Sequence, residues 1–151
     1  MLLFQDGEPF ATGVQPCLFR PATASDASKR LLIEVEIQGQ RTLAMVDTGA
    51  PYVICDPSIA RRIGVDPEAA LIKTRLFIRG YWVNGGIHRL DVTLRAAEGE
   101  QLTISTTAFV PDLENDQWPG LPCVIGLEGC LEWIRFAVDT VNNNFYFGPQ
   151  L

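Results

Sequence analysis

Residues 45–50, Met-Val-Asp-Thr-Gly-Ala, place a carboxylate, a small hydroxyl and a glycine side by side directly after an apolar run. The Asp47 carboxylate can hold or deprotonate a water molecule, and the Thr48 hydroxyl can fix the local backbone. Gly49 has no side chain, so it leaves room for another group to approach closely. The same three residues also make a good turn, so an ordinary turn is the alternative to a catalytic loop.

One carboxylate alone is a poor catalyst of amide hydrolysis. Two carboxylates about 3 Å apart cannot both ionise, so they share a proton and together supply a base and an acid. This chemistry needs no metal, histidine or thiol, and we expect neither a metal site nor a cofactor. The sequence agrees, because His88 is its one histidine and its cysteines form no Cys-x-x-Cys pair.

The four cysteines are interpreted as reduced, mostly buried thiols, which predicts a cytoplasmic protein. A disulfide pair is the alternative that composition alone leaves open. The cysteines are Cys17, Cys55, Cys123 and Cys130.

The length of 151 residues suits one domain with a real core, and 47% hydrophobic with 20% charged residues is an ordinary globular composition. A net charge of −6 argues against nucleic acid as a partner, since that surface needs clustered lysine and arginine. No apolar run reaches the roughly 18 residues of a membrane span, so no membrane association is expected. The N-terminal residues lack a basic region, and we do not expect a signal peptide.

Apolar and polar residues alternate over 31–38 and again over 41–47, with a turn at Gly39-Gln40, which predicts two paired strands leading to Asp47. Residues 56–64 follow with the signature of a short helix. Asp56 can cap it, Pro57 suits its first turn and Gly64 can end it. Before these elements, residues 1–30 are predicted to be an irregular arm, and 31–151 the folded domain.

Further along, apolar and aromatic runs at 75–83 and 87–96 flank Asn84-Gly85-Gly86, which predicts a hairpin turning there. Strands are predicted at 102–110 and 123–126, and helical spacing over 127–134 predicts a second short helix. The last two strands lie within 136–148, about an asparagine-rich turn. The fold class is therefore all-β, or mainly β with two short helices.

The stretch 44–54, the Val-Ile-Gly at 124–126 and the segments 127–134 and 136–148 occur in an order that resembles the single-domain retropepsin-like aspartic proteases of retroviruses and bacteria. The resemblance runs from about Leu31 to Phe147. It implies a closed β-barrel of the acid-protease type and the activity of an aspartic endopeptidase.

Carried over to this sequence, the resemblance makes Asp47 the catalytic carboxylate, with Thr48 bonding to the partner's active-site loop and Gly49 shaping the path beside the water. Ala50 flanks the substrate, while Val124, Ile125 and Gly126 support the loop from beneath. A flap that closes over the peptide is implied at Gly80, Tyr81, Trp82, Val83, Asn84, Gly85 and Gly86. Simple cross-strand packing is the alternative for Tyr81 and Trp82.

The Asp-Thr-Gly sequence occurs once, and 151 residues cannot hold two such lobes. The resemblance therefore implies a homodimer in which each chain contributes one Asp47 to a site that hydrolyses a peptide or protein substrate. The terminal segment 145–151 and the arm are candidates for the sheet that joins the subunits. Pro51 and the bulky flap favour an alternative, a peptide-binding or dimerisation module of the same fold that is catalytically weak or inactive.

Overall fold

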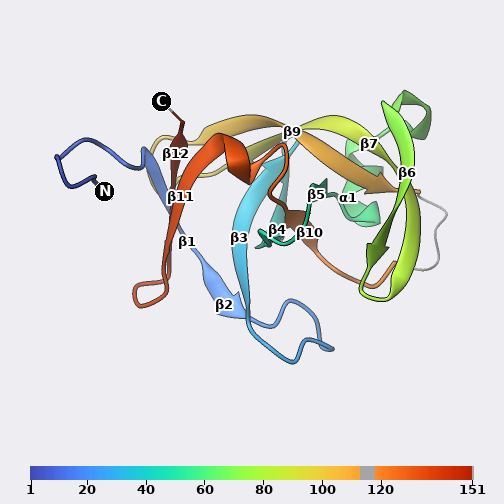
Figure 1. The fold of residues 1–151 in the computed structure, drawn as a ribbon, viewed down its shortest axis with the longest axis horizontal. Coiled ribbons are helices and arrows are strands. Elements are labelled where there is room, and N and C mark those ends of the chain that lie inside the picture. Colours follow the sequence, from blue (N-terminus) through green and yellow to red (C-terminus); the bar gives the residue numbers. More distant parts are fainter. Residues whose placement is uncertain (113–117, 151) are drawn as a thin grey trace.

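The computed structural model describes residues 1–112 and 118–150, which are mainly β-structure (Figure 1). This confirms the predicted all-β class. The strands are β1 (Gly13–Pro16), β2 (Leu18–Arg20), β3 (Arg30–Ile37), β4 (Gln40–Val46), β5 (Val53–Ile54), β6 (Ile72–Ile78), β7 (Tyr81–Leu94), β8 (Glu98–Gly99), β9 (Leu102–Pro111), β10 (Cys123–Ile125), β11 (Ile134–Asp139) and β12 (Asn144–Pro149). The described helices are α1 (Pro57–Ile63) and the 3₁₀ turns Pro67–Ala69 and Leu131–Trp133.

The larger of two sheets has the order β2-β3-β4-β10-β5-β9-β7-β6, and an additional pairing of β3 with β7 closes it into a ring. The ring is irregular, because β5 has two residues and meets β10 through the single pair Val124–Ile54. Buried side chains of the ring strands, such as Val35, Val92 and Ile125, belong to one hydrophobic cluster. The fold is thus an irregular form of the closed barrel that the resemblance implies.

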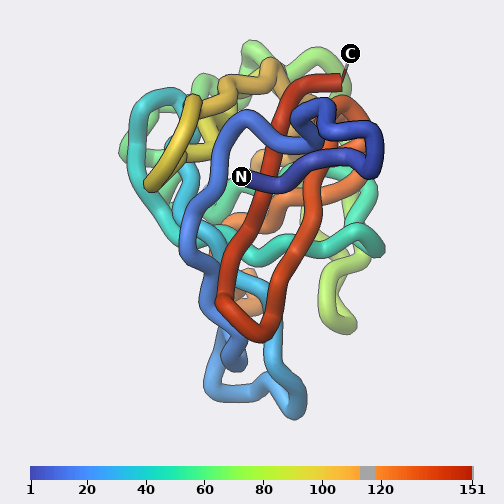
Figure 2. Tube along the Cα trace, turned by 90° about the vertical axis from the view of Figure 1, so that its left-hand side faces the viewer, coloured from blue at the N-terminus to red at the C-terminus, as the bar shows by residue number. Residues whose placement is uncertain are grey.

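The smaller sheet has the order β11-β12-β1-β8, so the two ends of the chain lie side by side (Figure 2). β1 runs antiparallel to β12, from the pair Gly13–Phe147 to the pair Pro16–Asn144. The prediction that residues 1–30 are irregular is therefore wrong for β1 and β2, which are too short to show a hydrophobic period in the sequence. The domain boundary at residue 30 stays a prediction.

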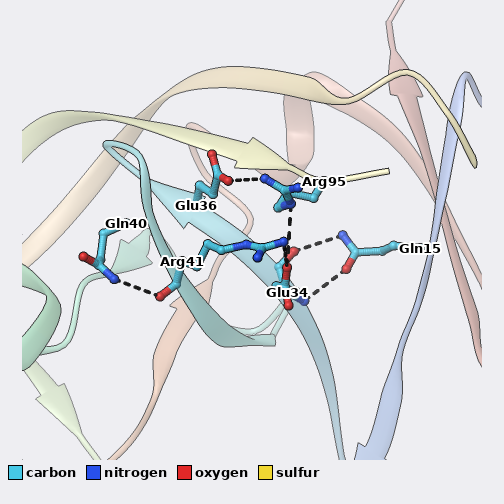
Figure 3. Close-up of polar contacts among 6 residues, drawn as sticks. All are labelled: Gln15, Glu34, Glu36, Gln40, Arg41 and Arg95. Atoms are coloured by element: carbon cyan, nitrogen blue, oxygen red, sulfur yellow. Dashed lines mark hydrogen bonds and ion pairs between the residues drawn. The ribbon is translucent and has the colours of Figure 1, made fainter. Parts of the chain in front are cut away.

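The buried side chain of Gln15 joins the two sheets (Figure 3). Its amide nitrogen donates to the Glu34 carbonyl oxygen at 3.1 Å, and its amide oxygen accepts from the Glu34 backbone nitrogen at 3.0 Å. The Gln15 side chain thereby forms the two hydrogen bonds with the backbone of β3 that a neighbouring strand would otherwise form. Around it, Arg41 lies 3.0 Å from the Glu34 carboxylate, and Arg95 forms ion pairs with Glu34 and Glu36.

Helix α1 forms as its sequence predicts. The Asp56 carboxylate accepts from the Ile59 backbone nitrogen at 3.0 Å, and Gly64 ends the helix in the left-handed conformation at φ 69°. The second predicted helix, over 127–134, is wrong: only the 3₁₀ turn Leu131–Trp133 forms there. Gly129 interrupts it with a φ of 67°, at a point where an added Cβ would lie 2.5 Å from the Thr107 hydroxyl.

The β6–β7 hairpin turns at Arg79-Gly80, and the prediction of a turn at Asn84-Gly85-Gly86 is wrong. Arg79 and Gly80 have φ values of 46° and 86°, which is the geometry that a two-residue hairpin loop requires. The pair Ile78–Tyr81 closes the turn.

Gly85 lies within β7, at a point where its neighbours leave no space for a side chain. An added Cβ at Gly85 would lie 2.3 Å from the Val110 carbonyl oxygen of β9. The residue is therefore glycine for close packing between strands and not for a turn.

Candidate active site

Strand β4 ends at Val46, and Asp47 is the first residue of the loop that follows. The parallel neighbour of β4 is β10, in which Ile125 is the partner of Val46. The Asp47 backbone nitrogen donates to the Ile125 carbonyl oxygen at 3.0 Å. The two strands thus fix the point at which the carboxylate leaves the sheet.

The loop itself folds back on Asp47. The Gly49 backbone nitrogen donates to the Asp47 Oδ1 at 2.8 Å, and the Ala50 backbone nitrogen donates to the Asp47 carbonyl oxygen at 3.1 Å. Asp47 is half-buried, whereas Thr48 and Gly49 are exposed. One carboxylate oxygen is therefore held by the backbone of its own loop, which orients the side chain.

The residues predicted to support the loop lie against it. Val124 and Ile125 are buried, and Gly126 lies so close to the loop that an added Cβ would be 2.1 Å from the Tyr52 carbonyl oxygen. The Leu127 backbone nitrogen donates to the Ala50 carbonyl oxygen at 2.8 Å. Only glycine permits this contact between the two loops.

Pro51 also takes part in this contact, through its carbonyl oxygen. It accepts from the Glu128 backbone nitrogen at 2.6 Å. The missing proline N–H therefore does not prevent the loop from being held in place.

The Asp47 loop borders a cleft of about 350 Å³. Its other wall comes from the first strand of the hairpin and its turn. The lining residues are Arg30, Met45, Asp47, Gly49, Ala50, Pro51, Ile54, Leu76, Phe77, Ile78, Arg79, Leu121 and Val124.

The residues lining this cleft differ from the predicted flap residues. The cleft is lined by β6 and Arg79, whereas none of the residues 80–86 borders it. Trp82 instead packs across the hairpin against Phe77, with ring centroids 5.1 Å apart, and Tyr81 is exposed. Sequence reasoning missed this wall because the Asn-Gly signal outweighed the weaker Arg-Gly signal five residues earlier, and no sequence signal marked Arg30.

Other reactive side chains lie apart from this cleft. In the ranges 1–112 and 118–150, no group of three or more His, Cys, Asp or Glu side chains could hold a metal ion. His88 is buried, and this burial, aided by the charge of Lys73, lowers its pKa, so it stays neutral over most of the physiological range.

The four cysteines are free and buried. A hydrogen bond with Cys55, together with burial, raises the pKa of Cys123, and burial raises the pKa of Cys130 to about 12. Neither thiol is therefore suited to act as a nucleophile.

Comparison with protein families assigns residues 33–110, just over half of the sequence, to the family described as aspartyl protease. The chain belongs to the aspartyl protease family. The matched segment contains the Asp47 loop, helix α1 and the β6–β7 hairpin. A search of curated proteins gave no match to this sequence.

Two solved structures superpose on this chain, and the first has the same fold. A retropepsin-like aspartic protease from Rickettsia conorii superposes with a TM-score of 0.55 at 18% identity, over 91% of this chain and 95% of that chain. The retroviral protease-like domain of Ddi1 from Leishmania major superposes with a TM-score of 0.45 at 21% identity, over 80% and 94%. The first likeness identifies this member of the aspartyl protease family as retropepsin-like in fold.

Proposed function

We propose that the protein is an aspartic endopeptidase that acts as a homodimer, with one Asp47 from each subunit. The observation that carries the proposal is the Asp47 loop, held by β10 at the edge of a cleft in a chain with a single Asp-Thr-Gly sequence. Family membership supports the activity, and the single loop supports the dimer because one carboxylate supplies only half of the acid–base pair.

In the proposed reaction, one Asp47 is ionised and its partner is protonated, with a water molecule between them. The ionised carboxylate takes a proton from the water as the oxygen attacks the peptide carbonyl carbon. The protonated carboxyl donates to the carbonyl oxygen, and a proton then passes to the leaving amine nitrogen. Gly49 orients the Asp47 carboxylate through its backbone nitrogen, 2.8 Å from the Asp47 Oδ1.

The apolar walls of the cleft would bind substrate side chains. Met45, Ile54 and Val124 lie on the side of the Asp47 loop, and Leu76 and Ile78 lie on the side of the hairpin. Closure of the hairpin over an extended peptide would exclude water from the reacting carbonyl. These walls favour substrates with apolar side chains next to the cleaved peptide bond.

The dimer contact proposed here does not use the backbone of β12. This strand is paired with β11 on one side and with β1 on the other, so both of its edges are already used within one chain. The partner must instead contact the exposed side of the loop at Thr48 and Gly49, since only this arrangement brings the two Asp47 side chains together.

The activity is tested by Asp47→Asn, with Asp91→Asn as a control, since Asp91 is an exposed residue on β7 outside the cleft. We expect cleavage of a mixed peptide library to fall by roughly 10²- to 10⁴-fold in Asp47→Asn, the usual contribution of a general acid or base. Asp91→Asn should cleave like the unmodified protein. Undiminished cleavage by Asp47→Asn would end the proposal.

The assembly is tested by measuring solution mass as a function of protein concentration. We expect a dimer at the concentrations at which cleavage is detected. A strict monomer that still cleaves would exclude the shared site.

The proposed compartment is the cytoplasm, which the four free thiols support. Separately, no helix in the described part of the chain has the length and apolar character needed to cross a bilayer.

A further inference from the structure

Two arginines lie in the apolar cleft beside Asp47, although the chain as a whole has a net charge of −6. Arg30 is the first residue of β3, and Arg79 is in the turn of the β6–β7 hairpin. Both are near Asp26, in the loop between β2 and β3, which reaches the hairpin turn at the lower end of the molecule (Figure 1). These three residues form one charged cluster at the cleft.

The Asp26 carboxylate is fully used within the chain. Its side chain is 2% exposed, and its Oδ1 lies 2.6 Å from the Arg79 Nη2. Its Oδ2 accepts from the backbone nitrogens of Ala22 at 2.8 Å and Thr23 at 3.0 Å. Arg79 also donates to the Thr23 hydroxyl at 3.3 Å. Arg79 therefore has its counter-charge and its hydrogen-bond acceptors inside the protein.

Arg30 does not have the same partners. Its Nε lies 3.6 Å from the Asp26 Oδ1, which is an ion-pair distance but too long for a hydrogen bond. Within the described residues, this buried nitrogen has no hydrogen-bond partner, while 40% of the Arg30 side chain is exposed. A buried donor without an acceptor is unfavourable, so Asp26 leaves the Arg30 guanidinium incompletely satisfied. The Nε is itself enclosed, and an acceptor from outside the chain would meet the other guanidinium N–H groups of this partly exposed side chain, which borders the cleft.

We propose that Arg30 binds a carboxylate of the substrate, so that the cleft selects peptides carrying an acidic group close to the apolar residue that fills it. The planar guanidinium presents parallel N–H donors that match the two oxygens of a carboxylate. The adjacent walls at Met45 and Ile54 are apolar and suit the neighbouring side chain. This inference rests on the proposed function, because it assumes that a peptide occupies the cleft.

The acidic group has two possible sources, the side chain of Glu or Asp and the free C-terminus of a peptide. Peptide pairs separate them: Glu against Gln at each position around the cleaved bond, and a free C-terminus against a C-terminal amide. The pairs are compared by kcat/KM in the unmodified protein and by binding affinity in the Asp47→Asn variant, which reports occupancy without turnover.

We expect one carboxylate peptide to be preferred about tenfold over its amide partner, the effect of one charge-assisted hydrogen bond. Arg30→Gln should bring this ratio close to one, and Arg30→Lys should restore part of it. Lys29→Gln is the matched control, since Lys29 is an exposed cation next in sequence but outside the cleft, and it should keep the full ratio. Thermal unfolding shows whether each variant is folded.

A ratio near one in the unmodified protein, or an unchanged ratio in a folded Arg30→Gln variant, would overturn the inference. Cleavage without this preference leaves the proposed function standing and removes only the role of Arg30. Binding that depends on Arg30 without any cleavage has the opposite meaning: it supports carboxylate recognition and contradicts the endopeptidase.

Discussion

At the scale of single residues, the Asp47 loop is held by close contacts, and at Gly126 these leave no room for a side chain. Gly126 meets the carbonyl oxygens of Tyr52 and Ala50, at 2.1 Å and 2.8 Å from an added Cβ. Asp47 is tied to Ile125 and to Gly49 through its backbone and side chain. The position of the carboxylate therefore depends in part on Ile125 and Gly126, which are not among the residues that line the cleft.

The substitution Gly126→Ala should displace the Asp47 loop. Because the new methyl group overlaps backbone atoms, we expect the free energy of unfolding to fall by about 1–3 kcal/mol, with cleavage reduced in the folded fraction. Urea unfolding measures the first effect. Leu127→Ala, at an exposed neighbouring position, should change stability by roughly 0.5 kcal/mol or less, and an equal loss in both variants would contradict this reading.

Because the Cys130 thiol is buried, we expect the protein to lose stability at alkaline pH. Burial raises the pKa of Cys130 from 9.0 to about 12, so the folded protein keeps a proton that the unfolded chain loses. The stabilisation of the folded state by the protonated thiol is complete below pH 9.0. The free energy of unfolding should then fall by about 1.4 kcal/mol per pH unit as the pH rises from 9.0 to about 12. Urea unfolding at a series of pH values tests this, and Cys130→Ala should flatten the slope. A slope that the variant leaves unchanged would disprove the assignment to Cys130.

At the scale of elements, the β6–β7 hairpin is held at its turn by the β2–β3 loop, which lies about 50 residues earlier in the sequence. Arg79 pairs with Asp26 in the β2–β3 loop, while Leu76 and Phe77 face the cleft. In the proposed function a peptide enters between the hairpin and the Asp47 loop, and we expect the hairpin turn to move as it does so. We therefore expect the Arg79–Asp26 ion pair to resist this movement.

Asp26→Asn should loosen the hairpin turn. Burial alone would raise the pKa of Asp26, but hydrogen bonds from Thr23, Arg79 and Ala22 and the charge of Arg79 lower it overall. The contact is therefore complete above the unfolded carboxyl pKa of about 3.9 and is lost as pH falls through the lower folded value. We expect amide hydrogen exchange at residues 78–81 to quicken by roughly a factor of 10 at neutral pH.

Asp139→Asn is the control for the hairpin experiment. Hydrogen bonds from Asn142 lower the pKa of Asp139 as well, but Asp139 lies at the end of β11, in the smaller sheet. Exchange at residues 78–81 should not change in this variant. If amide hydrogen exchange at residues 78–81 becomes equally faster in both variants, the cause is a general loss of stability and not the release of Arg79.

At the scale of the whole molecule, the proposed function makes one chain the owner of half of an active site. Gln15 of β1 joins the smaller sheet to β3 of the larger one, and the terminal strands β1 and β12 are paired within the chain. The fold of one chain therefore uses the backbone of its terminal strands, and the exposed residues Thr48 and Gly49 are the surface at which we propose that a second copy binds.

Mixing the unmodified protein with a ninefold excess of Asp47→Asn should lower the peptide cleavage per unmodified chain, which dilution of the unmodified protein by an inert protein would not do. With random exchange of subunits, about one tenth of the unmodified chains find an unmodified partner, so activity per unmodified chain should fall to about one tenth. The measurement is peptide cleavage after the mixture has equilibrated. Activity that only follows the amount of unmodified protein would mean that one Asp47 is sufficient.

The parts of this protein that depend on near neighbours in the sequence could be predicted from it. The strand pair leading to Asp47 and the capped helix α1 follow from alternation and from the types of Asp56, Pro57 and Gly64, whose partners are a few residues away. The order of these segments was also sufficient to indicate the retropepsin-like fold. Local hydrogen bonds and a short hydrophobic period are sufficient to predict these features, because the residues that form them are close in the sequence.

Only the tertiary structure decided what surrounds the carboxylate. The hairpin turns at Arg79-Gly80 because Gly85 is needed where β7 packs against Val110 of β9, a demand that no local pattern reveals. The cleft likewise brings Arg30 next to Asp47. Such features come from strands that meet only when the sheet closes, and packing across that closure overrides the local preference of Asn-Gly for a turn.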